Sequence, residues 1–133
     1  MRERIRDKER LVHILTAIDA LLDGSKRYSP EQAEKDTIIF YGFVKQLEII
    51  GEATYKLTKE FREEHPKAPW DKMEGMRHVL VHGYFLISPP KVWNVIHKDI
   101  PVLRPQIEAY IKEESALQES EDMNERHINA IEE

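Results

Sequence analysis

A long run of apolar residues at helical spacing, between residues 36 and 61, constrains the fold more than any other feature. The apolar positions recur every three or four residues, which is the repeat of one face of an α-helix. These positions are Ile39, Phe40, Phe43, Val44, Leu47, Ile50, Ala53, Leu57 and Phe61. We predict a single helix of about seven turns from Asp36 to Phe61. Gly51 lies inside it, where glycine costs about 1 kcal/mol relative to alanine, so we expect another backbone to approach closely there.

Two other segments carry the same helical repeat. The first covers residues 5–22, and we expect that helix to end at Gly24. The last covers residues 92–111 and contains two prolines, which have no backbone N–H to donate inside a helix. We therefore predict that this last helix is kinked or split near Asp99.

Local start and stop signals mark the remaining boundaries. Ser29-Pro30-Glu31-Gln32 has the order of a capping box, so a short helix should start there. Residues 63–69 contain two prolines and several charges, and we expect the chain to turn in that stretch. Trp70 then opens a short helix that reaches His82, with its ring in the core. Ser88-Pro89-Pro90 is the start signal of the last helix.

These patterns predict an all-α fold, an up-down bundle of four to five helices with a kinked last helix. The sequence has no internal repeat, no glycine-rich phosphate loop and no alternating strand pattern. Residues 1–113 should form one helical domain. Residues 114–133 are rich in Glu, Ser, Asn and Gln, and this polar C-terminal tail is expected to be disordered or loosely helical.

Composition narrows the functional classes. The 133 residues include no cysteine, which excludes disulfides and thiolate metal sites and fits a cytoplasmic protein. The charged N-terminus is followed by an amphipathic segment, so we expect neither a signal peptide nor a membrane span. The formal net charge of −5 argues against broad nucleic-acid binding, although a small local basic site is compatible with it.

The highest density of acid–base and phosphate-binding side chains lies in nine residues that begin at Arg77 and include His82 and Tyr84. If residues 73–82 are helical, the motif lies at the end of that helix, and Gly83 follows as a residue able to take positive φ. Five residues separate Arg77 from His82, which is about 140° around a straight helix. Within one chain the two side chains would converge only if the helix end unwinds, and otherwise a second subunit must contribute.

Phosphodiester chemistry without a metal needs these residue types. Arg77 could hold a phosphate through forked hydrogen bonds and stabilise its developing charge. His82 could take a proton from a ribose 2′-hydroxyl or give one to the leaving 5′-oxygen. The structural alternative is that Arg77 makes a surface ion pair, His82 interacts with the helix end, and Tyr84 packs on the core. Spacing alone slightly favours the structural alternative.

Two other pairs of side chains have a helical spacing. His78 and His82 lie four residues apart, as in a zinc-binding helix, but the sequence places no third ligand and lacks the His-Glu-x-x-His pattern. Glu48 and Glu52 form an acidic i, i+4 pair. By default we expect Glu48 and Glu52 to lie on a solvated helix face, and the alternative is that they orient Arg77.

The motif also carries a family resemblance. Arg77, four residues, His82, one residue and Tyr84 match the signature of the HepT-like toxins, a branch of the HEPN-domain ribonucleases. His78 stands where many members carry Asn or Asp, and we include it among the candidate catalytic residues. Further stretches resemble the family in the same order, namely Gln46-Leu47-Glu48-Ile49-Ile50-Gly51-Glu52-Ala53, Val92-Trp93 and Asp99-Ile100-Pro101. The resemblance covers roughly residues 5–113.

The resemblance implies a HEPN-like helical bundle and a homodimer in which two Arg77 and two His82 side chains surround one cleft. It also implies a metal-independent endoribonuclease that needs no cofactor and acts on RNA as a toxin. The implied partner is a minimal nucleotidyltransferase antitoxin that transfers AMP to Tyr84. Added nucleotides would bring negative charge and bulk to the place of a substrate phosphate.

A second interpretation belongs to a different class of protein. The chain could be a catalytically silent helical dimer whose role is to bind a nucleotidyltransferase. The complete set of Arg77, His82 and Tyr84 favours the enzyme, because a purely structural protein has no evident need for it. The sequence does not identify the RNA substrate or the cleavage position.

Overall fold

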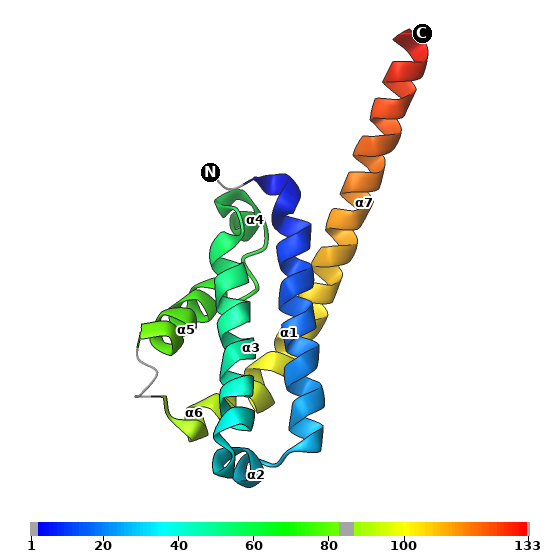
Figure 1. Cartoon of the computed structure of the whole chain (residues 1–133). Helices are drawn as coiled ribbons and strands as arrows, with labels where there is room; N and C mark the ends of the chain where they lie inside the picture. Colours follow the sequence, from blue (N-terminus) through cyan, green and yellow to red (C-terminus); the bar gives the residue numbers. More distant parts are fainter. Residues whose placement is uncertain (1–2, 83–86, 133) are drawn as a thin grey trace.

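The computed structural model describes residues 3–82 and 87–132, and Figure 1 shows their helices packed side by side. The described residues are almost entirely helical and include no strand, which confirms the predicted all-α class. The elements are η1 (Arg4–Arg6), α1 (Asp7–Arg27), α2 (Pro30–Lys35), α3 (Thr37–Lys56), α4 (Lys59–Glu64), α5 (Trp70–His82), α6 (Pro89–Asn94), η3 (Val95–Asp99) and α7 (Ile100–Glu132).

The centre of the bundle is the layer formed by α1, α3 and α7. Helix α1 packs against both α3 and α7, and α5 packs on α3 (Figure 1). The apolar stripes predicted from the sequence face one another in this layer. The fully buried core side chains include Leu11, Ile14, Ile18, Leu21, Ile50, Leu57, Phe61, Ile96 and Ile107. Burial of these stripes is the main force that holds the bundle together.

The capping box at the start of α2 is confirmed. The backbone N–H of Gln32 donates to Ser29 Oγ at 3.2 Å, and the Ser29 N–H donates to Gln32 Oε1 at 2.9 Å. Pro30 occupies the first turn, where the missing N–H has no partner to lose. This local signal is sufficient to start the helix because both halves of the box lie within four residues.

The prediction that the first helix stops at Gly24 was wrong. Helix α1 continues to Arg27, and Gly24 is buried inside it. A Cβ at this position would lie 3.1 Å from the Phe43 ring, so the glycine allows α1 and α3 to approach each other. The glycine therefore serves helix packing rather than helix termination.

The prediction of one helix from Asp36 to Phe61 was also wrong. Helix α3 ends at Lys56, and Leu57 is extended. The carboxylate of Asp7, fully buried, accepts hydrogen bonds from the Thr58 N–H at 2.9 Å and the Thr58 hydroxyl at 2.6 Å. Thr58 then caps α4 by accepting the Phe61 N–H at 3.2 Å. Leu57 and Phe61 stay buried on both sides of the break, so the apolar repeat gives no sign of it.

The predicted kink in the last helix is present as a break in helical type. Helix α6 is joined to α7 by η3, a single π-helical segment at Val95–Asp99. Figure 1 shows that the chain changes direction between α6 and α7. Pro105 lies inside α7, which continues past it.

The polar segment after residue 113 is helical as far as the structure describes it. It continues α7 beyond the bundle, as Figure 1 shows. Its first residue, Glu114, is buried, and Glu114 Oε1 accepts a hydrogen bond from Arg4 Nη2 at 2.7 Å. A domain boundary at residue 113 stays a prediction. None of the helices in the described part of the chain is long and apolar enough to cross a membrane.

Candidate active site

Helix α5 carries Arg77 and His82, and its backbone packs directly on α3 at Gly51. A Cβ on Gly51 would come within 3.0 Å of the Met73 carbonyl oxygen and 3.1 Å of Arg77 Cα, and closer still to Arg77 Cβ. The expectation of a close backbone approach at Gly51 is therefore confirmed. A side chain at this position would force α5 away, so the glycine lets the backbone of Arg77 lie directly on α3.

The N-terminal end of α5 is fixed by one buried ring and one arginine. Trp70 is buried in the core, as predicted, and its indole N–H donates to the His65 carbonyl at 2.7 Å. Arg62 of α4 binds the Glu74 carboxylate at 2.9 Å. These contacts hold the helix at its start, so the position of Arg77 two turns later is determined by the packing of α5 on α3 and α4.

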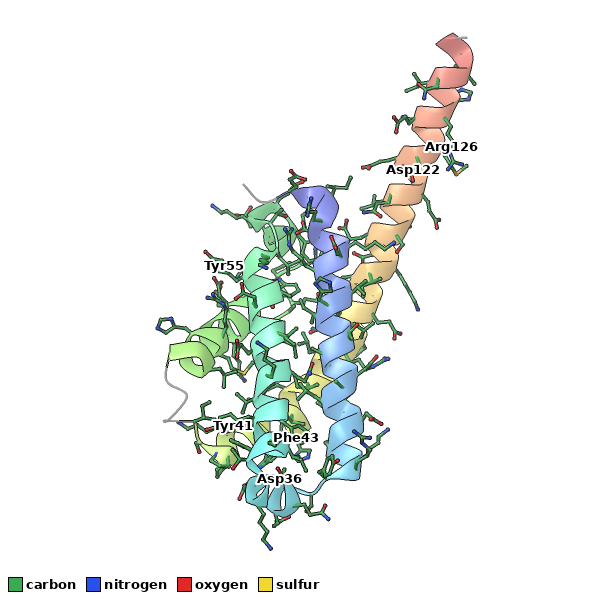
Figure 2. All side chains as sticks on the ribbon, in the orientation of Figure 1. Asp36, Tyr41, Phe43, Tyr55, Asp122 and Arg126 are labelled. Atoms are coloured by element: carbon green, nitrogen blue, oxygen red, sulfur yellow. The ribbon has the colours of Figure 1, made fainter. Side chains whose placement is uncertain are left out.

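The Arg77 side chain is held by two residues of α3. Its Nε donates a hydrogen bond to Oε2 of Glu52, and its guanidinium carbon lies 4.9 Å from the centre of the Tyr55 ring. Figure 2 shows Tyr55 on α3, close to the end of that helix. The second carboxylate oxygen of Glu52 lies 3.9 Å from Lys56 Nζ. Glu52 therefore takes the role that the sequence offered as the alternative, and it orients Arg77.

The other half of the acidic pair has a different partner. Glu48 binds Lys45 at 3.3 Å on the surface of α3, so only Glu52 reaches α5. Tyr55 had not been singled out in the sequence. The signal that could have found it is its position: Tyr55 follows Gly51 by four residues and Glu52 by three, which places all three on one side of the helix.

The bond to Glu52 uses Nε and leaves the two Nη atoms of Arg77 available. Within the described part of the chain, no hydrogen bond involves either Nη atom, and the Arg77 side chain is 27% exposed. A guanidinium held through Nε and a ring face keeps its two-nitrogen fork for an anion. His78, the next residue, is exposed. The arrangement can bind a phosphate beside α5.

The remaining motif residues are only partly described. Helix α5 is regular up to His82, so positions 77 and 82 are about 140° apart around its axis. The side chain of His82, and the whole of Gly83 and Tyr84, lie outside the described residues. The structure thus brings Arg77 together with Glu52 and Tyr55, while the relation of Arg77 to His82 and Tyr84 stays a prediction.

An apolar groove lies beside α5. Its volume is about 370 Å³, and it lies between α3, α5 and α6. The apolar residues that line it are Leu47, Met76, Leu80, Ile87, Val92 and Val95. Gly75 also lines it, and a Cβ on Gly75 would meet no atom within 4 Å. Gly75 therefore leaves open space on this face of α5.

A second groove, of about 350 Å³, lies between α1 and α3 on the side of Glu52. It is lined by the two glutamates of α3 and by Arg10, His13, Lys45 and Lys56.

The described residues include no group of three His, Cys, Asp or Glu side chains placed to hold a metal. A metal site at His78 and His82 would use the His82 side chain, which lies outside the described residues.

The chain is similar to a family of ribonucleases. A family model described as "Ribonuclease HepT-like" matches residues 14–110. "Putative RNase TTE0752" of Caldanaerobacter subterraneus subsp. tengcongensis is 42% identical over 104 residues, covering 78% of this chain and 93% of that protein. "Probable ribonuclease HepT" of Thermococcus cleftensis is 32% identical over 101 residues, covering 76% and 92%.

A third relative, "Putative RNase MJ1380" of Methanocaldococcus jannaschii, is 32% identical over 98 residues, covering 74% of this chain and 90% of that protein. No solved structure matches the chain. The family match includes α3 and α5, the two helices that build the Arg77 site. The chain therefore belongs to the HepT-like ribonuclease family.

Proposed function

We propose that this chain is a metal-independent endoribonuclease toxin whose phosphate-binding group is Arg77. The observation that carries the proposal is the way α3 holds this side chain. Glu52 binds Nε, Tyr55 lies against the guanidinium, and the Nη fork has no hydrogen bond within the described residues. A preorganised cation of this kind is what a pentacoordinate phosphate transition state requires. Membership of a ribonuclease family makes RNA the matching substrate.

The chemistry is an attack of the ribose 2′-oxygen on the adjacent phosphorus. The P–O2′ bond forms while the P–O5′ bond breaks, which leaves a 2′,3′-cyclic phosphate and a free 5′-hydroxyl. One group must take the 2′ proton and another must protonate the leaving 5′-oxygen. We assign these transfers to His82, with His78 as the second candidate, and the phosphate charge to Arg77.

A homodimer through α5 completes the proposed site. Positions 77 and 82 of one helix point about 140° apart, so two helices side by side would place Arg77 of one chain near His82 of the other. Two features of α5 support such packing: the apolar groove beside Met76 and Leu80, and the exposed Gly75, whose missing side chain nothing in the described chain explains. An interface of this kind is shared equally by both copies.

We propose that the activity is controlled at Tyr84 by a minimal nucleotidyltransferase antitoxin. Transfer of AMP to the phenol would add a phosphate two residues after His82, where Arg77 could capture it as it would a substrate phosphate. Coexpression with a nucleotidyltransferase encoded next to this chain should raise its intact mass by one or more AMP units. Tyr84→Phe should escape neutralisation. If the variant is silenced as well as the parent and no AMP is found, the antitoxin acts by binding alone.

The catalytic proposal is tested by cleavage of RNA in the presence of EDTA. We expect Arg77→Ala and His82→Ala each to abolish cleavage and growth inhibition to a similar extent, because residues of one catalytic unit do not act additively. Arg27→Ala and His127→Ala are matched controls at exposed positions and should stay active. Loss of activity on chelation would instead support a metal at His78 and His82. An intact fold without any cleavage would support the binding-module alternative.

A further inference from the structure

The C-terminal part of α7 projects from the bundle as a helix with exposed apolar residues at both ends of one side. We call residues 115–132 the arm. Figure 1 shows the arm beyond the ends of the neighbouring helices, and the family match ends before it, at residue 110. An isolated helix of this length is marginal in water unless one face packs on something. The arm therefore needs a partner for its apolar side.

The side of the arm that needs a partner continues the buried stripe of α7. In the bundle this stripe consists of Leu103, Ile107, Tyr110 and Glu114, which alternate in steps of four and three. The same steps lead along the arm to Leu117, Glu121, Asn124, Ile128 and Ile131. Leu117, Ile128 and Ile131 are 52%, 46% and 71% exposed. Alternating steps of four and three are the spacing of residues that pack between two paired helices.

A groove lies where the arm leaves the bundle. Its volume is about 450 Å³, and Ile5 and Leu117, both exposed apolar side chains, line it. Glu60 and Glu64 of α4 also line the groove, together with Arg4, which binds Glu64 at 2.8 Å. The base of the arm thus offers an apolar surface with a charged border.

The far half of the arm carries apolar side chains on the same stripe. Ile128 and Ile131 provide exposed apolar surface, and Arg126 is the arm's only Lys or Arg. Figure 2 shows Arg126 and Asp122 on the arm, beyond the bundle. The arm has five carboxylates against this single arginine, so a nucleic acid is repelled as a partner.

We propose that the arms of two copies pair antiparallel, so that the tip of each arm lies in the groove at the base of the other. Centred between residues 122 and 123, this register places Leu117 opposite Ile128 of the partner subunit and Glu121 opposite Asn124 of the partner subunit. The order apolar, polar, polar, apolar is symmetric, as a two-fold interface requires. Parallel pairing would place the two Glu121 carboxylates against each other, which is destabilising.

This interface is independent of the proposed ribonuclease function. It uses α7 and the N-terminal end of the bundle, whereas the proposed catalytic dimer uses α5. A chain with both interfaces would associate into particles larger than a dimer. Disruption of the arm should leave RNA cleavage unchanged, so that failure of either proposal can be recognised separately.

The experiment uses the absence of native cysteine in this chain. Full-length Leu117→Cys and Ile128→Cys are oxidised mildly, each alone and as an equal mixture. We expect a covalent dimer only in the mixture, because antiparallel pairing brings position 117 next to position 128 of the partner subunit, within reach of a disulfide. Both side chains are exposed, so the substitutions should leave the fold intact. Glu119→Cys and Arg126→Cys, on the opposite side of the arm, are the control pair and should not cross-link.

A dimer of Leu117→Cys alone would show parallel pairing, and the absence of any cross-link would show that the arm has another partner; either result overturns the proposal. A second measurement is the solution mass by light scattering. Leu117→Glu should lower it, whereas Val102→Glu, at a similarly exposed apolar position of α7 within the bundle, should not. An unchanged mass in Leu117→Glu would also contradict the proposal.

Discussion

Glu52 binds Arg77 through Nε and leaves the two Nη atoms of the guanidinium without a hydrogen bond among the described residues. The contact joins the two helices on which the proposed site depends, across the point where Gly51 lets them touch. An arginine bound at this edge has one orientation in which to meet a phosphate. The pairing therefore has a direct consequence for activity.

Glu52→Ala should lower RNA cleavage by about 100-fold, because a guanidinium displaced by about 1 Å loses its alignment with the reacting phosphate. Glu52→Gln, which keeps an acceptor for Nε, should fall between this variant and the parent. Steady-state kinetics on one RNA substrate provide the measurement. Glu48→Ala, in the same acidic pair but bound to Lys45, is the control and should stay active. Faster cleavage by Glu52→Ala would show that the carboxylate masks Arg77 instead.

Gly51→Ala should destabilise the fold and reduce activity together. The added methyl would meet Arg77 and the Met73 carbonyl, so α5 must move away from α3 at a cost of about 1–3 kcal/mol. Gly42→Ala on the same helix is the matched control. Its Cβ meets no atom within 4 Å, and alanine there should stabilise the helix by up to about 1 kcal/mol. Urea unfolding of both variants decides the comparison, and equal stability would contradict the account of Gly51.

The comparison of these glycines shows what a sequence can predict. Helix start signals such as Ser29 and Pro30 were read correctly because all the atoms involved lie within one turn. Gly24 and Gly51 each lie inside a helix, and in each the glycine is explained by a neighbour distant in sequence. A pattern within one segment identifies an unusual residue but does not decide between a helix end and a close approach.

The break after α3 depends on a contact that no local pattern contains. Asp7→Ala should lower the free energy of unfolding by about 3 kcal/mol, since it leaves the buried Thr58 N–H without its acceptor. Thr58→Ala should cost less, and Thr58→Ser should restore most of the stability. Thr16→Ala, an exposed threonine, should change stability by less than about 0.5 kcal/mol. Chemical denaturation followed by circular dichroism measures these values, and a neutral Asp7→Ala would contradict this explanation.

Tyr110 should make the fold sensitive to high pH. Burial, and next the nearby Glu113 carboxylate, raise the pKa of the Tyr110 phenol above its usual value. In the unfolded chain a tyrosine loses its proton near pH 10, whereas the folded protein holds this proton to a higher pH. Its contribution to stability is therefore complete below about pH 10 and is lost as the pH rises through the folded pKa.

Tyr110→Phe removes this titration. Its unfolding free energy should fall less between pH 8 and pH 11 than that of the parent, as urea titrations at the two pH values would show. Tyr41→Phe is the control at an exposed tyrosine and should follow the parent. Equal pH dependence in all three proteins would show that burial of Tyr110 has no such effect.

Prediction of the site from sequence reached a similar limit. The spacing of Arg77 and His82 indicated that one helix could not bring them together, and α5 is indeed regular to His82. The role of Glu52 stayed open because an i, i+4 acidic pair looks the same on a solvated face and on a face that receives an arginine. Only the packing of α5 on α3 distinguishes the two.

The central claim is that Arg77 of one subunit works with His82 of the other in a metal-free site. It is tested most directly by mixing inactive Arg77→Ala and His82→Ala chains, exchanging their subunits, and measuring RNA cleavage in EDTA. Random pairing makes half of the dimers mixed, and each mixed dimer keeps one of two Arg77–His82 combinations, so activity should return to about a quarter of the parent value. A mixture as inactive as either variant alone, with mixed dimers present by mass spectrometry, would contradict the shared site.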